Sequence, residues 1–265
     1  MKIFTLIITC FFIIQVYSQE LITDRPDITE SPYIVPQNHL QFEHGLSYSW
    51  GTIKNSFDPT FDVDYNVLQI ASTLVRYGIN DLVELRLEFN PTVSTIAGES
   101  ITGLPPMGLG IKSKLFTGDG AIPQIAILAT AYPGLLATEN MQPEVAIYEY
   151  RMAANHIFTE WWSVGWNFGA IISSITSPQY VYSLSSGFAI NEKAGCFVEA
   201  YGNFPANKLD ANVSDNLFLD AGFTYGFTPM LQADLSFGYE LTNINAYYSF
   251  GIGFSYLISL KKSDG

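Results

Sequence analysis

The chain has 265 residues, and only 14% of them are charged, compared with about 25% in ordinary soluble domains. A formal net charge of −13 argues against nucleic acid or an anionic membrane face as a partner. Beyond the N-terminus, no stretch approaches the roughly 18–20 continuous apolar residues of a membrane helix, so any membrane span must be built from strands.

The first 18 residues have the features of a secretory signal peptide. Lys2 supplies a basic start, an apolar run covers residues 3–14, and small residues precede a cleavage site after Ser18. Export then leaves Cys196 as the one cysteine of the mature chain, so no internal disulfide is expected.

Residues 19–37 are predicted to form an extended N-terminal segment. Pro26, Pro32 and Pro36 preclude a helix and favour extended or polyproline geometry. The charged side chains of this segment include Asp24, Arg25, Asp27 and Glu30.

Strand signals fill residues 38–260. Apolar and polar residues alternate with a period of two, most clearly from Leu217 to Phe227, where the odd positions are apolar. The predicted strands cover residues 38–50, 66–78, 81–92, 107–116, 123–132, 144–156, 160–172, 179–190, 193–203, 215–227, 230–240 and 246–258. Their number, twelve, is even, as single-chain bacterial barrels require.

Period two alone fits both a soluble sandwich and an outer-membrane barrel. Three features favour the barrel. The last runs are longer than the roughly 5–6 residues of a common globular strand, and their polar faces carry Ser, Gly, Asn and Gln instead of Lys and Glu. The last strand also carries Phe254 and Tyr256, which resemble the C-terminal signal read by the barrel-assembly machinery. We therefore predict an all-β, antiparallel transmembrane barrel over residues 38–260.

The connections indicate the orientation. Those after the second, fourth, sixth, eighth and tenth predicted strands are short, whereas residues 51–65, 93–106, 133–143 and 204–214 form longer loops. Outer-membrane barrels place their short turns in the periplasm. We therefore expect the outer membrane of a Gram-negative bacterium, with both termini periplasmic.

Charged residues on the polar face are expected to point into the lumen, because a basic side chain facing lipid near the midplane costs roughly 2–4 kcal/mol. In residues 81–92 and 107–116 the charges alternate cleanly with apolar residues. They form either a salt-bridge lattice that fills the lumen or a polar selectivity zone. The lumen candidates are Glu43, Arg76, Glu84, Arg86, Glu88, Lys112, Lys114, Glu199 and Asp234.

Features that enzymes need are scarce. The sequence contains no GxSxG, no HExxH and no phosphate-binding loop. Its three histidines, His39, His44 and His156, fall in the predicted periplasmic half, whereas a barrel phospholipase needs one near the outer leaflet. We expect no catalytic residue, no metal and no cofactor.

The opening of the mature chain resembles a known family. Thr23-Asp24-Arg25-Pro26-Asp27, followed by Glu30-Ser31-Pro32 and Gln41-Phe42-Glu43, resembles the start of the outer-membrane transporters described as "Putative MetA-pathway of phenol degradation". Later segments, such as Phe197-Val198-Glu199, match as well, so the resemblance covers essentially the whole mature chain. It implies an outer-membrane barrel that passes small, aromatic or hydrophobic compounds, and it assigns no catalytic residue.

The functional prediction is a passive channel whose partners are outer-membrane lipid and a small permeant. The alternative is a closed structural or surface-interaction barrel with a plugged lumen. Residues 19–37 either enter the lumen as a latch or form a solvated tail before the first strand. As a latch, Arg25 would meet Glu84 or Glu88, and Asp24 or Asp27 would meet Lys112 or Lys114.

Overall fold

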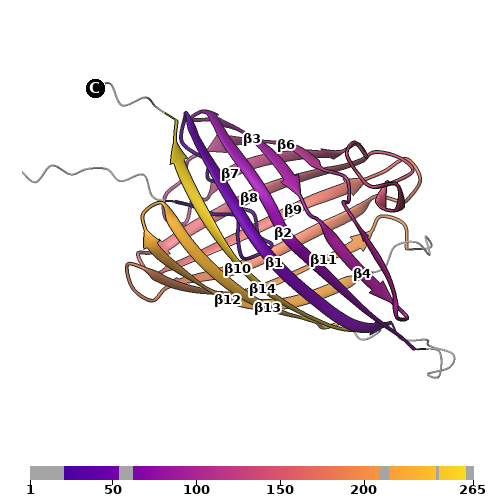
Figure 1. Cartoon of the computed structure of the whole chain (residues 1–265). Coiled ribbons are helices and arrows are strands. Elements are labelled where there is room, and N and C mark those ends of the chain that lie inside the picture. The colour runs from indigo at the N-terminus through magenta and orange to yellow at the C-terminus, as the bar shows by residue number, and fades with distance from the viewer. Residues whose placement is uncertain (1–20, 54–61, 209–214, 243–244, 261–265) are drawn as a thin grey trace, which may run out of the picture.

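The computed structural model describes residues 21–53, 62–208, 215–242 and 245–260. Residues 1–18 of the predicted signal peptide and residues 19 and 20 lie outside this part of the chain. The described residues form a barrel of antiparallel strands (Figure 1). In chain order these are β1 (His39–Ile53), β2 (Val63–Asn80), β3 (Val83–Phe89), β4 (Thr92–Ile96), β5 (Glu99–Gly103), β6 (Gly108–Phe116), β7 (Gln124–Tyr132), β8 (Ile147–Thr159), β9 (Trp162–Ile172), β10 (Gln179–Ala189), β11 (Ala194–Pro205), β12 (Asn216–Thr228), β13 (Leu231–Glu240) and β14 (Asn245–Ser259). A short 3₁₀ helix, η2 (Glu139–Met141), precedes β8.

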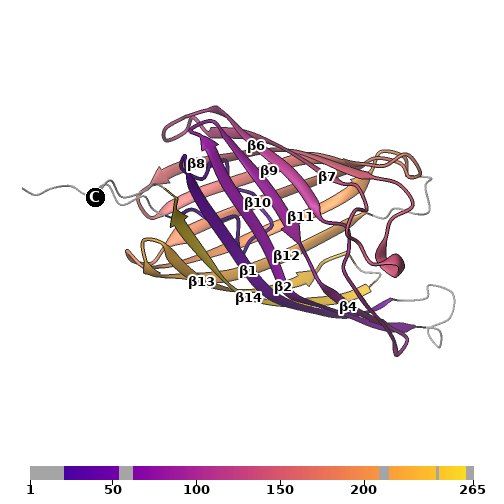
Figure 2. The ribbon, with the colours of Figure 1, turned by 45° about the horizontal axis from the view of Figure 1, so that its top comes forward.

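The sheet closes because β1 pairs with both β2 and β14. Twelve strands surround the lumen, and each predicted strand overlaps one of them, so the prediction of a twelve-stranded antiparallel barrel is confirmed. The strands are strongly tilted against the barrel axis (Figures 1 and 2). Closure leaves no unpaired sheet edge around the barrel, which is what a strand-built membrane span requires.

The predicted loop at residues 93–106 is largely a hairpin. Strands β4 and β5 pair with each other. Strand β4 also pairs with residues 65–69 of β2, next to the part of β2 that pairs with β3. Ala97 and Gly98 join them with φ values of 53° and 83°, the left-handed geometry of a tight two-residue hairpin turn. Two features hid this hairpin in the sequence. Its strands are too short for a clear alternation, and one turn residue, Ala97, adopts a left-handed conformation that usually requires Gly.

The two faces of the barrel differ in polarity. Large apolar side chains point outward and are exposed, for example Leu85, Leu184 and Phe237. Inward-pointing Glu84 and Lys112 are fully buried because the N-terminal segment fills the space beside them. The small buried apolar cluster of Leu21, Val35 and Leu257 joins that segment to the inner face of β14.

The two ends of the barrel also differ. The turns after β2, β6, β8, β10 and β12 gather at one end, called the short-turn end below (Figure 1). The amide of Leu21 donates to the carbonyl of Pro229 there, and the amide of Leu260 donates to the carbonyl of Asn38. Both ends of the described chain therefore lie at the short-turn end. Within the described residues, no helix has the length and hydrophobicity needed to cross a membrane.

A substitution on the outer face of the barrel tests whether that face contacts lipid. Leu184 lies at the middle of β10 and its side chain is 55% exposed on the outer surface. Replacement by Arg should lower the free energy of unfolding in lipid vesicles by about 2–4 kcal/mol, because the charge would face hydrocarbon. Leu184→Phe, the control, should change it little. Equal urea stability of the two variants would contradict the assignment of this face to lipid.

Candidate functional site in the barrel lumen

Residues 21–38, called the leader, run through the lumen as a loop that touches opposite walls (Figures 1 and 2). The loop starts beside β13, reaches β11 at Thr29, and returns to β2, where Gln37 bridges Gly78. Residues 27–30 are the leader tip, and residues 21–26 and 31–38 are the leader base. The base binds β2, β3, β6 and β13, whereas the tip reaches β9 and β11 and also keeps the Glu30 carboxylate on Arg86 of β3.

Three basic side chains point into the lumen beside the leader base. Arg76 on β2, Arg86 on β3 and Lys112 on β6 are each at most 4% exposed. The strand register places Arg76 directly opposite Arg86, and like charges in this position destabilise a sheet. Glu84 lies opposite Lys112. Glu84 also bridges the two guanidinium groups, at 2.9 Å from Nε of Arg76 and 3.1 Å from Nη1 of Arg86, but one carboxylate does not balance three bases, so a further carboxylate is needed.

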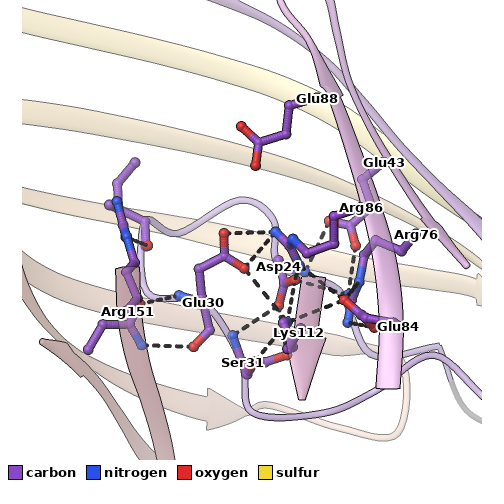
Figure 3. A network of polar contacts seen from close by, with 12 residues as sticks. Asp24, Glu30, Ser31, Glu43, Arg76, Glu84, Arg86, Glu88, Lys112 and Arg151 are labelled. Atoms are coloured by element: carbon purple, nitrogen blue, oxygen red, sulfur yellow. Dashed lines mark hydrogen bonds and ion pairs between the residues drawn. The ribbon is translucent and has the colours of Figure 1, made fainter. Parts of the chain in front are cut away.

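Asp24 of the leader supplies that carboxylate (Figure 3). Its Oδ2 lies 2.6 Å from Nη1 of Arg86, 2.7 Å from Nζ of Lys112 and 3.2 Å from Nη1 of Arg76. Its Oδ1 accepts hydrogen bonds from the amide and the hydroxyl of Ser31. Burial alone would raise the pKa of Asp24, but Arg76, Lys112 and Arg86 together hold that pKa well below its ordinary value. Asp24 is therefore ionised, and it neutralises charge from three strands.

Two wall carboxylates complete the coordination of Arg76. Glu84 accepts from its Nε at 2.9 Å and from its Nη2 at 3.0 Å, and Glu43 accepts from its Nη1 at 2.9 Å. The forked contact with Glu84 is the two-point geometry that makes guanidinium–carboxylate pairs strong. Glu84 and Glu43 also accept from leader amides, those of Val35 and Asp24 respectively. The wall and the leader thus share one network.

Glu30 binds the same network from the other end of the leader loop. Both of its carboxylate oxygens lie 2.8 Å from Nη2 of Arg86 (Figure 3). Lys112 also donates to the carbonyl of Ser31 at 2.9 Å. In this network the wall contributes three bases and two carboxylates, and the leader adds two carboxylates. The leader therefore complements a positive excess that the wall carries by itself.

Arg25 binds a different partner from the two that were predicted for it. Instead of meeting Glu84 or Glu88, it forms a forked ion pair with Asp234 on β13, at 3.0 and 3.3 Å. Its guanidinium lies on Gly45 of β1 and Gly253 of β14, where any Cβ would clash with it. These two glycines are directly paired across the β1–β14 contact. The slot they create explains why Arg25 lies on this side of the lumen.

The leader tip is bound by the opposite wall. The amides of Ile28 and Thr29 donate to the Glu199 carboxylate at 2.8 and 2.7 Å, and the Thr29 hydroxyl contacts the same group. The Glu30 amide donates to Oδ1 of Asn167 at 2.7 Å, and Nδ2 of Asn167 donates back to the Glu30 carbonyl at 2.9 Å. One carboxylate and one amide side chain thereby hold the turn of the leader.

Asp27 does not meet Lys112 or Lys114. It lies beside Glu199 and accepts a hydrogen bond from Ser185, and burial together with the Glu199 charge raises the pKa of Asp27. Glu199 also lies close enough to Asp220 to interact with it electrostatically. In the part of the chain that is described, no group of His, Cys, Asp and Glu side chains has the arrangement of a metal site.

Two predicted lumen residues lie outside these contacts. Glu88 accepts a hydrogen bond from the Tyr132 hydroxyl at 2.8 Å, and Lys114 is half-buried beside the bulge that ends β6. Sequence reasoning missed Asn167 and Ser183, which hold the leader tip, and Gln232, which donates to the Thr23 hydroxyl. They share the inward phase of their strands, and this is the signal that could have found them.

A cavity of about 960 Å³ remains between the leader and the β8–β12 wall. It extends from the short-turn end to the leader tip, and Thr29 and Glu30 line it. The wall contributes small residues, including Gly165, Ser185 and Gly187, together with larger ones such as Trp162 and Phe197. The leader therefore fills the side of the lumen next to β1, β2, β3 and β6 and leaves the other side open below its tip.

Comparison with known protein families identifies the family of this chain. Residues 23–258 match the family model described as "Putative MetA-pathway of phenol degradation", so the chain belongs to that family. Comparison with curated protein sequences finds no match.

Solved outer-membrane barrels have the same fold. An outer membrane channel from Pseudomonas putida F1 is similar with a TM-score of 0.65 at 12% identity, covering 85% of this chain and 97% of that one. The NanC porin has a TM-score of 0.53 at 9% identity, covering 80% and 98% of the two chains. The translocator domain of the autotransporter NalP from Neisseria meningitidis has a TM-score of 0.53 at 11% identity, covering 82% and 88%. These likenesses establish the fold.

The network predicts the effect of removing one charge. Asp24→Asn should weaken docking of the leader by about 3–5 kcal/mol, because it removes one of the two carboxylates that contact all three buried bases. Proteinase K added to the folded barrel should then cleave the leader much faster. Asp27→Asn makes the same chemical change beside an acidic neighbour and should leave cleavage as slow as before. Equal cleavage rates in the two variants would contradict the role assigned to Asp24.

Proposed function

We propose that this protein is a passive outer-membrane channel for small molecules, and that the leader is its constriction. The observation that carries the proposal is a closed barrel with an apolar outside, whose polar lumen is filled on one side only. A barrel used only as a scaffold does not need a cavity of about 960 Å³ open toward one end. Passage requires neither a cofactor nor a catalytic group.

The orientation follows from the loops. With the short-turn end in the periplasm, both ends of the described chain and the mouth of the cavity are periplasmic, and the long connections face the cell exterior. The apolar outer surface then contacts outer-membrane lipid. Phe254 and Tyr256, near the end of β14, are the residues through which the barrel-assembly machinery would recognise the chain during insertion.

The permeant is proposed to be small and aromatic or hydrophobic. Support comes from the family description, which refers to phenol degradation, and from the mixed lining of the cavity. Phe197 and Tyr33 line it together with Ser185 and Asn155, so it offers both rings and hydrogen-bonding groups. Such a lining suits compounds that combine an aromatic body with a polar group.

The contacts of the charged lumen residues favour the salt-bridge lattice over the polar selectivity zone. Arg76, Arg86, Lys112, Glu43 and Glu84 are all occupied by each other and by the leader. We therefore assign them to holding the leader, and we do not assign them to an open selectivity ring.

The second candidate is a closed structural or surface-interaction barrel. It is favoured by the contacts of the leader with β11 and β9 on one side and β2 and β3 on the other, since these contacts span the lumen. Under this reading the leader is a permanent plug.

Conductance in planar bilayers separates the two candidates. Purified full-length protein should conduct in small steps, and a variant lacking residues 19–36 should conduct in larger ones, because the constriction is gone. A variant lacking residues 261–265 serves as the control and should match the full chain. Silence of both the full chain and the variant without the leader, with folding shown by heat-modifiable gel migration, would favour the structural barrel.

A further inference from the structure

The barrel closes through one contact between distant parts of the chain. Strand β1 pairs with β14 along its whole length, from His39 opposite Ser259 to Ile53 opposite Asn245. This contact is called the closure seam. Most neighbouring strands of the wall are joined by a turn or a loop, whereas the seam joins the first strand to the last. Its formation carries the entropic cost of bringing distant segments together, and no connecting loop holds its two strands to each other.

The inner face of the seam offers little side-chain contact. Three successive inward-facing pairs carry nothing larger than Ser: Gly45–Gly253, Ser47–Gly251 and Ser49–Ser249. Cross-strand side-chain pairs stabilise a sheet, and a glycine supplies none. Within the described residues, the buried hydroxyl of Ser255 in the next pair has no hydrogen-bond partner. The outer face differs, since large side chains such as Tyr48 and Phe250 are paired there. The seam therefore leaves room for another contact on its lumen side.

The start of the leader lies along this inner face. The carbonyl of Ile22 accepts hydrogen bonds from Nε2 of Gln41 on β1 and from Nη1 of Arg76 on β2, at 3.0 and 3.2 Å. The amide of Asp24 donates to Oε2 of Glu43 on β1 at 3.0 Å. Residues 22 and 24 therefore bind the strands on one side of the seam.

The intervening residues bind the strand on the other side. Nε2 of Gln232 on β13 donates to the Thr23 hydroxyl at 3.0 Å. Arg25 forms its forked ion pair with Asp234 on the same strand. Because an extended chain directs successive residues to opposite sides, residues 22–25 can bind both sides of the seam at once.

Arg25 also crosses the seam itself. Its guanidinium lies over the paired Gly45 and Gly253, where a Cβ on either residue would overlap it. Nearer the short-turn end, Leu21 joins Leu257 of β14 in a buried apolar cluster. The lack of side chains at the two glycines is thus matched to a cation that reaches from β1 across β14 to β13.

We propose that residues 21–25 are a clasp for the closure seam. They hold β1 and β2 against β13 and β14 from the lumen side, and they keep the barrel wall from opening into lipid. This role goes beyond the constriction of a channel, and it does not depend on the passage of any permeant. It also gives a reason for the glycine pair, since side chains there would exclude the guanidinium of Arg25.

Removing the cation tests the clasp. In Arg25→Ala, hydrogen exchange of the protein in lipid should become about tenfold faster in β1 and β14, because a forked charge-assisted pair is lost, while β7 and β8 stay protected. Arg151→Ala, the control, removes an ion pair to Glu149 within β8 and should leave the seam protected. Arg25→Lys, which keeps the charge, should show a smaller effect at the same strands, and it serves if Arg25→Ala does not fold. Unchanged exchange at the seam, or an equal increase in every strand, would overturn the proposal.

A cross-link shows whether the effect acts through the seam. Ser49 and Ser249 are directly opposite each other on β1 and β14, at a separation that permits a disulfide. In a Cys196→Ser, Arg25→Ala background, oxidised Ser49→Cys, Ser249→Cys should restore protection of both strands. The control pair Ala126→Cys, Ala153→Cys joins β7 to β8 and should not restore it. Fast exchange at the seam of protein that mass spectrometry shows to be cross-linked through residues 49 and 249 would contradict the clasp.

Discussion

The carboxylate of Asp24 is the interaction on which the lumen depends. The register of β2 and β3 forces Arg76 and Arg86 to face each other, and β6 adds Lys112 to the same layer. Buried like charges of this kind are stable only when an anion is held between them. The wall supplies one such anion, Glu84, and the leader supplies the second, Asp24, so the electrostatics of the strands and the position of the leader cannot be separated.

From this contact the arrangement of the leader follows. With Asp24 fixed on the β2–β6 side, Arg25 reaches Asp234 across the glycine slot, and the loop must turn back within the lumen. The turn brings residues 28–30 to Glu199 and Asn167 on the far wall. The space under the turn remains open because β9 and β10 present Gly165 and Gly187 there. The docked leader and the cavity beside it are two results of one docking geometry.

The sequence predicts the barrel well because its physical signals are local. Alternation with a period of two gives the strands, and the cost of charge in lipid directs residues such as Glu84 and Lys112 inward. The contacts of the leader are not local. Arg25 binds Asp234 because Gly45 and Gly253 are paired at barrel closure, and that register joins residues more than 200 positions apart. The β4–β5 hairpin was missed because its turn uses Ala97 in a conformation that favours Gly.

Hydrogen exchange of the leader tests the central claim most directly. The amides of Asp24, Ile28, Thr29, Glu30, Ser31 and Val35 each donate to a carboxylate or amide side chain inside the barrel. If the leader is docked in the lumen, mass spectrometry of the folded protein in lipid should find a peptide covering residues 21–36 protected well beyond the rate of a free chain. Complete exchange of that peptide at the first time point, with the strands still protected, would show a solvated tail and contradict the account.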